Sequence, residues 1–175
     1  MITETSTKEE LLSELDDTAM QLLNAMQTIE ESDFNTVPYE GSWTAGQLAR
    51  HVFKSTSGIA AALGKNGAIA KRNAGEKIPM LRDTFLNFSI KLQAPQFIVP
   101  EEKVYDKQAS IDELKQAFQL FKTNASATDV NELVEGLPLG EVTKLELIHF
   151  IIYHTQRHIY QLEKISKALQ EKTTV

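Results

Sequence analysis

Two histidines lie four residues apart in an apolar stretch near the C-terminus, residues 146–161. In a helix this spacing places His154 and His158 on one face, with their Cβ atoms roughly 5–6 Å apart. Neutral imidazole is the commonest metal-ligating side chain, and a pair at this spacing is a frequent bidentate platform. The alternative is a pair that is satisfied by hydrogen bonds. Burial favours the metal site, because two adjacent buried imidazoles without partners are costly.

A third histidine, His51, can complete the site from another helix. It follows Leu48 by three residues and so lies on the inward face of a helix predicted over 44–63. Helix bundles often build metal sites from facing helices, although a single inward histidine is also common as a hydrogen-bonded core residue. Gln161 and Gln47 each lie within about one turn of a candidate ligand, and each could orient a ligand histidine or a bound water. The alternative for each is a helix cap or a core amide.

The fourth histidine, His149, is not expected to join this site. It precedes His154 by five residues, about 140° around a helix, so it is expected to be structural or exposed.

Two related chemistries, a zinc protease and a dimetal site, are not expected either. The residues between the histidine pair are Thr, Gln and Arg. The glutamate that serves as general base in His-Glu-x-x-His proteases is therefore missing. Acidic residues are scarce near these histidines, which argues against a carboxylate-bridged dimetal site.

The sequence pattern does not assign a functional role to several other polar groups, some of them next to the histidine pair. Arg157 is expected to form a salt bridge or to face solvent, and the roles of Tyr153 and Tyr160 stay open. Residues 64–77 form a polar segment with three glycines and four basic residues. A solvated loop is expected there, although its bases could attract an acidic ligand. The spacing of a Gly-x4-Gly-Lys-Ser/Thr phosphate loop is absent.

The elements that must position these side chains are four amphipathic helices. Apolar residues recur at spacings of three and four over about 7–30, 44–63, 110–130 and 143–170. Each run opens on a Ser or Thr that is followed three residues later by Glu or Gln, the pattern of a capping box. The pairs are Ser6 with Glu9 (or Thr7 with Glu10), Thr44 with Gln47, Ser110 with Glu113, and Thr143 with Glu146. Trp43 and Leu48 could add a hydrophobic staple.

A long insert separates the second and third predicted helices. Residues 80–92 are expected to form a short helix. Residues 93–100 are expected to be extended, because two prolines disfavour helix there, and this is the one strand candidate. Residues 131–140 are expected to be a connector. The pattern predicts an all-α fold: a four-helix bundle in a single domain, with a long crossover between helices two and three.

The composition limits the partners of this 175-residue chain, which is expected to form one domain over residues 1–175. A net charge of −6, from 24 acidic and 18 basic residues, argues against nucleic acid. No apolar run approaches the ~18 residues of a membrane span. The polar, acidic N-terminus lacks the features of a targeting peptide, so a cytoplasmic protein is expected. There is no cysteine, so any thiol chemistry must use a thiol from a substrate.

The stretch Ser42-Trp43-Thr44-Ala-Gly-Gln-Leu-Ala-Arg-His51, followed far downstream by His154-x-x-x-His158-x-x-Gln161, resembles the DinB-like superfamily, especially its smaller branch. The resemblance covers most of the chain. It implies a four-helix bundle with a divalent metal, such as zinc, nickel or iron, held by His51, His154 and His158. Characterised relatives include thiol transferases and isomerases that use a low-molecular-weight thiol such as bacillithiol or mycothiol, and some members form homodimers.

These observations leave two classes of function open. The first is a metal-dependent enzyme, a hydrolase or a thiol S-transferase, that acts on a small-molecule substrate. A metal with open coordination positions could bind a low-molecular-weight thiol and favour its thiolate. The alternative is a non-catalytic, metal-stabilised bundle that acts as a binding, sensing or stress-response module.

Overall fold

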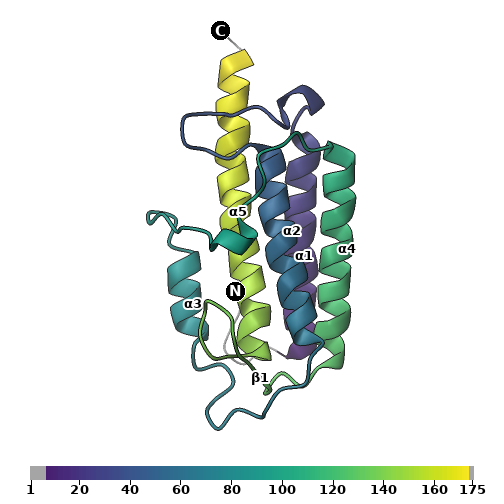
Figure 1. Ribbon diagram of the computed structural model, residues 1–175, viewed down its shortest axis with the longest axis vertical. Coiled ribbons are helices and arrows are strands. Elements are labelled where there is room, and N and C mark those ends of the chain that lie inside the picture. The colour runs from purple at the N-terminus through teal and green to yellow at the C-terminus, as the bar shows by residue number, and fades with distance from the viewer. Residues whose placement is uncertain (1–6, 174–175) are drawn as a thin grey trace.

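The structure is a computed structural model that describes residues 7–173, and it is predominantly helical (Figure 1). Four long helices run along a common axis: α1 (Lys8–Thr28), α2 (Ala45–Leu63), α4 (Lys107–Ala127) and α5 (Lys144–Thr173). α1 and α2 each pack against both α4 and α5, so α1 and α2 lie on one diagonal of the bundle. The predicted all-α four-helix bundle is confirmed. Within the described residues, no helix is both long enough and apolar enough to cross a membrane.

Apolar faces of all four long helices meet in one continuous core. α1 contributes leucines and a methionine, and α4 contributes two phenylalanines that are almost fully buried. The inward face of α5 is apolar on both sides of its histidines, which explains why a helix with polar residues at its centre still packs inside the bundle. The most buried members of the core include Leu15, Leu22, Met26, Leu48, Ile111, Leu114, Phe121, Ile148, Ile151 and Ile165.

Three of the predicted helix starts are capping boxes. At α1, Thr7 accepts a hydrogen bond from Glu10 N while the Glu10 side chain accepts one from Thr7 N; the alternative cap, Ser6, lies outside the described residues. Thr44 and Gln47 form the same reciprocal pair at the start of α2. At α5, Thr143 N donates to the Glu146 carboxylate and Glu146 N donates to Thr143 Oγ1. Each pair satisfies two backbone donors that the first helical turn leaves free.

The predicted start of α4 was wrong. The helix begins at Lys107, and its cap is Asp106, four residues before the predicted cap Ser110; the Asp106 carboxylate accepts a hydrogen bond from Ala109 N at 2.6 Å. Ser110 lies inside the first turn, where its hydroxyl donates to the Asp106 carbonyl at 2.7 Å. Aspartate is as good an N-cap as serine, so the Ser110–Glu113 pattern could not decide between them.

The insert also differs from its prediction. α3 (Ile78–Phe85) is shorter than the helix expected over 80–92, and the predicted extended segment holds the 3₁₀ turn η2 (Gln96–Ile98) in place of a strand. A second 3₁₀ turn, η1 (Glu31–Asp33), follows α1. The two strands of the described chain lie elsewhere, as the antiparallel pair β1 (Leu133–Val134) and β2 (Val142–Thr143). Their connection contains two glycines with positive φ, which allow the chain to reverse.

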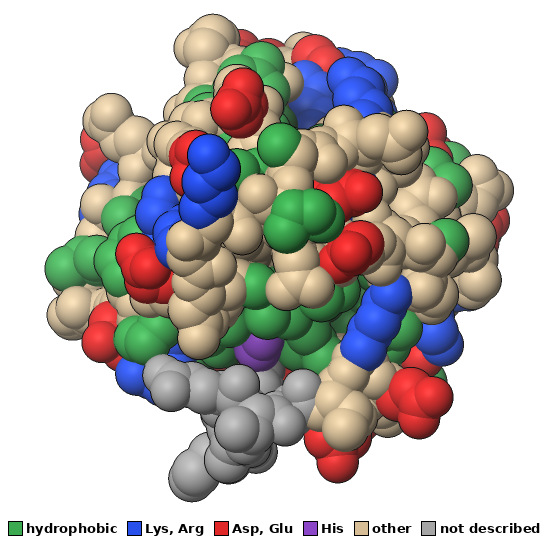
Figure 2. Space-filling model, turned by 90° about the horizontal axis from the view of Figure 1, so that it is seen from below, with side chains coloured by type: hydrophobic (Ala, Val, Ile, Leu, Met, Phe, Trp, Pro, Cys, Tyr) green, Lys and Arg blue, Asp and Glu red, His purple; other side chains and the backbone are tan. Residues whose placement is uncertain are grey.

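Residues 64–77 form a largely exposed loop, as expected, but backbone pairing holds part of it in place. Their middle lies along β1, where Leu133 N donates to Ala68 O at 2.8 Å and Ala70 N donates to Asn131 O at 2.9 Å. A Cβ on Gly67 would lie 2.1 Å from the Leu133 carbonyl oxygen, so the close approach requires glycine. Seen from below, basic and acidic side chains are interspersed over the end of the bundle where this loop lies (Figure 2).

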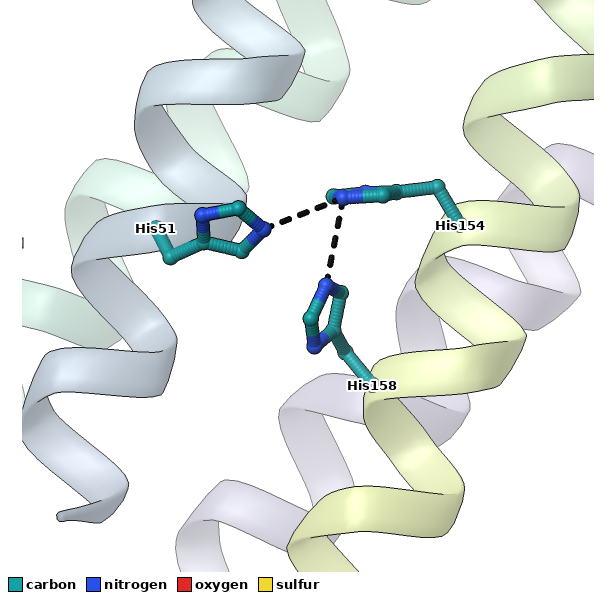
Figure 3. A group of neighbouring side chains, drawn as sticks. All are labelled: His51, His154 and His158. Atoms are coloured by element: carbon teal, nitrogen blue, oxygen red, sulfur yellow. Dashed lines mark hydrogen bonds between the residues drawn. The ribbon is translucent and has the colours of Figure 1, made fainter. Parts of the chain in front are cut away.

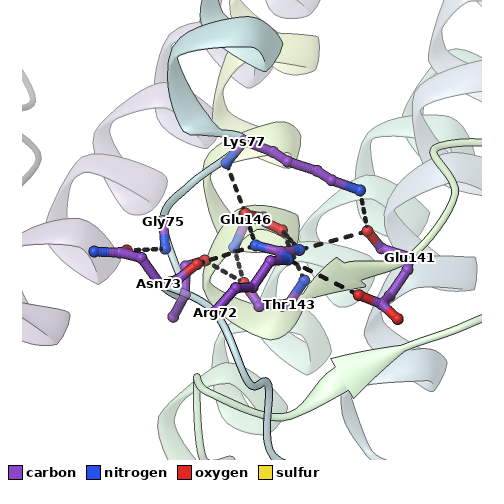
Figure 4. Close-up of polar contacts among 8 residues, drawn as sticks. Arg72, Asn73, Gly75, Lys77, Glu141, Thr143 and Glu146 are labelled. Carbon is purple, nitrogen blue, oxygen red and sulfur yellow. Dashed lines mark hydrogen bonds and ion pairs between the residues drawn. The ribbon is translucent and has the colours of Figure 1, made fainter.

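The end of the same loop is fastened to α5 by a buried carboxylate (Figure 4). Arg72 donates to both Glu146 oxygens at 2.7 and 2.8 Å, and the backbone N–H groups of Lys77 and Thr143 donate at 2.8 and 2.9 Å. Burial raises the pKa of Glu146, but the hydrogen bonds from Arg72 and the two N–H groups outweigh it and hold the pKa below its ordinary value. The Lys77 ammonium also donates to the carbonyl oxygen of Glu141, so two bases of the loop serve structure in this conformation.

Candidate metal centre

The structure brings the three predicted histidines together between two helices that lie side by side (Figure 3). His51 comes from α2, and His154 and His158 come from adjacent turns of α5. The Nε2 atom of His154 lies 3.1 Å from Nε2 of His51 and 3.1 Å from Nε2 of His158. One nitrogen from each ring lies within 4.8 Å of the other two. We call these three residues the histidine cluster.

Burial keeps the histidine cluster uncharged near neutral pH. His51, His154 and His158 are 3%, 5% and 6% exposed. Loss of water lowers the pKa of His51, and it lowers the pKa of His158 to about 3 with a further contribution from His51. Burial also places the pKa of His154 well below its ordinary value, and the neighbouring histidines and Arg157 add to that shift. Neutral imidazole is the form that ligates metals.

Hydrogen bonds on the outer sides of two rings decide their tautomers. Nδ1 of His51 lies 2.9 Å from the carbonyl oxygen of Ile98, and Nδ1 of His158 lies 2.9 Å from Oε1 of Gln161. Both oxygens are acceptors, so each Nδ1 carries the proton and donates it. The Nε2 atoms of His51 and His158 are then bare lone pairs that point inward. Carbonyl partners of this kind are typical of metal-ligating histidines.

His154 lies between these two lone pairs, and its hydrogen bonding is incomplete. A neutral imidazole carries one proton, so Nε2 of His154 can donate to one of its two neighbours but cannot satisfy both. Its Nδ1 is buried and has no hydrogen-bond partner in the described structure. Three inward nitrogens with too few protons suit a shared cation. The donor set therefore fits a divalent transition metal, for which imidazole is a common ligand.

Aromatic rings wall the histidine cluster. The ring of Trp43 lies 4.9 Å from that of His51, centroid to centroid. On the other side, the rings of Phe150 and Phe85 lie 5.3 and 6.2 Å from that of His154. Such walls exclude water and lower the local dielectric constant, which strengthens electrostatic interactions inside the site.

The two glutamines predicted to orient ligands lie in different settings. Gln161 accepts the hydrogen bond from His158, which is the contact that the prediction requires. Gln47 uses its side-chain oxygen to accept from Thr44 N in the capping box of α2. This fixes the start of the helix that carries His51 one turn later. A direct role of Gln47 at a bound ligand stays a prediction.

Other residues singled out in the sequence lie outside the histidine cluster. His149 is buried elsewhere on α5, where its Nδ1 lies 3.3 Å from the Tyr153 hydroxyl, and burial lowers its pKa to about 4. Tyr160 stacks on Phe88 at 4.3 Å between centroids. Arg157 was expected to meet a carboxylate or solvent, but it donates to the backbone carbonyls of Phe85, the last residue of α3, and of Asn87 and Ile90 in the segment that follows.

Sequence reasoning missed three contributors to the site, one backbone carbonyl and two aromatic rings. The Ile98 carbonyl is a backbone acceptor, which a pattern of side chains cannot predict. The sequence identified Phe85 and Phe150 as apolar helix positions, but their spacing did not predict that their rings would lie beside a polar cluster. The proline-bounded insert was the one available signal, because an irregular segment beside a site often supplies backbone groups.

Comparisons with known proteins bear on the family and the fold of the chain. The sequence model of the DinB superfamily matches residues 14–162. None of the curated proteins compared with the chain matches it. Among solved structures, TT2238, described as a four-helix bundle protein, matches with a TM-score of 0.59 at 18% identity over 90% of this chain and 99% of that one.

A second solved structure, YfiT from Bacillus subtilis, matches with a TM-score of 0.63 at 12% identity. The match covers 97% of this chain and 93% of YfiT, which is described as a probable metal-dependent hydrolase with an unusual four-helix bundle topology. At these identities the two similarities show a shared fold.

Proposed function

We propose that this chain, which belongs to the DinB superfamily, holds a divalent transition metal through His51, His154 and His158 and uses it to act on a small molecule. The observation that carries the proposal is the convergence of three buried Nε2 atoms with too few protons to satisfy one another. Zinc, nickel and iron all accept imidazole ligands, so the proposed metal is one of these three divalent ions.

The chain's own residues support such a centre in three ways. Ile98 and Gln161 fix two imidazoles with their lone pairs directed inward. Trp43, Phe85 and Phe150 keep water away from the rings. A metal with three protein ligands keeps a position for water or substrate and lowers the pKa of what it binds there.

The reaction class that we favour is attack on a small electrophile by water or by a low-molecular-weight thiol. The description of YfiT as a probable metal-dependent hydrolase supports the first nucleophile. The absence of cysteine from the chain is compatible with the second, because the thiol would then come from a cosubstrate. A cytoplasmic location and a homodimer belong to the same proposal.

A second candidate is a metal that only pins α2 to α5, with no turnover. The burial of the histidine cluster, at most 6% exposed, favours it, since a substrate cannot reach the site in this conformation. A structural metal contributes directly to folding free energy. The two candidates differ in whether the loaded protein turns over a substrate.

The test compares metal-stripped protein with protein reloaded with zinc, nickel or iron. Hydrolysis of ester and amide substrates and addition of thiols to epoxides would be assayed in parallel. We expect turnover with one metal, loss of turnover in His154→Ala, and retention in His149→Phe, which changes a buried histidine outside the cluster. Turnover that survives metal removal would contradict the enzymatic proposal. A metal-dependent rise in melting temperature without turnover would favour the structural candidate.

A further inference from the structure

Residues 86–101, which we call the strap, run over the histidine cluster. The strap leaves the end of α3 and crosses in front of α5 and α2 toward α4 (Figure 1). Its regular structure is the three-residue turn η2, which packs against α2. Several of its apolar side chains face outward, and Phe97 is 65% exposed. A segment with so little regular structure and buried apolar area opens at lower free energy than the helices beneath it.

One end of the strap is fastened to α5 by Arg157. Arg157 Nη1 donates to the carbonyl oxygens of Phe85 at 3.3 Å and Asn87 at 3.0 Å, and Nη2 donates to that of Ile90. Arg157 directly precedes His158 and lies three residues after His154. The rigid, planar guanidinium directs several donors at separate carbonyls in one fixed geometry.

The other end is fastened to α2 on both sides of His51. Lys54 donates to Val99 O at 3.0 Å and pairs with Glu101 at 2.7 Å, while Arg50 Nε reaches the same carboxylate at 3.2 Å. The Lys54 and Arg50 contacts hold the pKa of Glu101 at about 2. Glu101 is 46% exposed, so this pairing is screened by solvent and is weaker than a buried one.

The strap also takes part in the site that it covers. The Ile98 carbonyl accepts the Nδ1–H of His51, so the closed strap fixes the tautomer of that ring. Displacement of the strap would remove this acceptor and uncover the outer side of the His51 ring. The strap therefore both covers and orients His51.

We infer that the strap is a gate over the histidine cluster, latched to α5 by Arg157 and to α2 by the Lys54–Glu101–Arg50 group. Metal and small substrates enter when it opens, and the site is complete when it closes. The inference rests on the proposed function for its purpose. Its test does not depend on that function, because access to the histidines can be measured without metal.

The test is the rate at which diethyl pyrocarbonate modifies each histidine of the metal-free protein, followed by peptide mass spectrometry. This reagent attacks neutral imidazole and requires physical access. In Arg157→Gln we expect modification of the three cluster histidines to accelerate about tenfold, the equivalent of about 1.4 kcal/mol of easier opening. The buried His149 is the internal control and should keep its wild-type rate. Arg82→Gln, which removes an exposed arginine paired with Asp83 on α3, should change neither rate.

Three results would overturn the gate. The cluster histidines of Arg157→Gln could react at the wild-type rate, His149 could accelerate as much as they do, or Arg82→Gln could have the same effect. If Arg157→Gln does not fold, amide hydrogen exchange of the wild-type protein decides the matter. Strap amides should then exchange at least about tenfold faster than those of α2 and α5 around the cluster. Equal protection of strap and helices would contradict the inference.

Discussion

The three rings of the histidine cluster are not equivalent. His51 and His158 each donate outward to a carbonyl oxygen, whereas Nδ1 of His154 is buried without a partner in the described structure. An outward donor holds the ring in place and makes the inner nitrogen more basic. The acceptors of the first two rings should therefore contribute to metal affinity although neither touches the metal position.

Gln161→Met tests this at His158. The substitution keeps the length of the side chain and removes the acceptor, so metal affinity should fall about 10- to 100-fold. The measurement is a competition titration of the reloaded protein against a chelator of known affinity. Gln156→Met, on the same helix, is the control and should bind as the wild type does. An unchanged affinity in Gln161→Met would show that the hydrogen bond plays no part in metal binding.

His149 predicts a pH dependence that is separate from the metal. Burial lowers its pKa to about 4 from 6.5, so the unfolded chain binds the proton more tightly than the folded one. Its contribution to stability is complete above pH 6.5 and is lost as the pH falls toward 4. As the pH is lowered from 6.5 toward 4, the free energy of unfolding should decrease in both proteins. The decrease should be steeper in the wild type than in His149→Phe, by about 1.4 kcal/mol per pH unit. Parallel urea-unfolding curves of the two proteins across that range would contradict the assignment.

The start of α5 depends on the loop that precedes α3. Glu146 accepts four hydrogen bonds, two from Arg72 and two from backbone N–H groups, and it is fully buried. One carboxylate thus closes the capping box of α5 and anchors residues 64–77. The helix that carries two of the cluster histidines begins at this junction.

Glu146→Leu should be severely destabilising. It leaves the Arg72 guanidinium and two backbone donors without their acceptor, and breaking a buried pair in this way costs about 3–5 kcal/mol. Urea unfolding measures the loss. Glu141→Gln is the matched control, because the Glu141 side chain is 52% exposed and its carboxylate lies 3.9 Å from Arg72 Nε, too far for a strong ion pair. This substitution should change stability by less than about 0.5 kcal/mol. Equal effects of the two substitutions would refute the special role of Glu146.

Two glycines of α2 should respond in opposite directions to alanine. A Cβ on Gly46 would lie 2.9 Å from Tyr105 Cβ and 3.2 Å from the Phe34 ring, whereas one on Gly58 meets nothing within 4 Å. Gly46→Ala should therefore destabilise the fold by about 1–3 kcal/mol through overpacking. Gly58→Ala should stabilise it by about 0.5–1 kcal/mol, because alanine favours the helix interior. Thermal melts of both variants check the pair, and a neutral or stabilising Gly46→Ala would contradict the close packing of this helix start.

The bundle as a whole places residues far apart in sequence at one point. His51 and His154 are separated by 103 positions, yet α2 and α5 lie side by side. The two consecutive helices α1 and α2 instead lie on a diagonal, and the insert between α2 and α4 supplies the strap. The histidine cluster therefore lies between two helices, α2 and α5, that are not consecutive in the bundle, and the strap comes from the insert that separates α2 from α4.

The sequence was sufficient for the bundle and for the inward positions of His51, His154 and His158, because both follow from helical periodicity. It did not decide whether His149 is buried or exposed, and the structure buries it. The sequence was insufficient where several local solutions have similar energies. Asp106 and Ser110 were equally good caps, and the chain uses the former. The two short strands and the path of residues 86–101 depend on backbone pairing and on Arg157, whose carbonyl partners have no side-chain signature. For the same reason, the Ile98 contact of His51 could not be predicted.

The most direct test of the central claim is the metal content of the purified protein, after stripping and reloading, measured by elemental analysis. The wild type and His149→Phe should each retain one divalent metal ion per chain. His51→Ala, His154→Ala and His158→Ala should each lose it at the same free metal concentration. A wild-type protein without stoichiometric metal, or a His154→Ala variant that retains as much as the wild type, would contradict the account and reduce the histidine cluster to a hydrogen-bonded core.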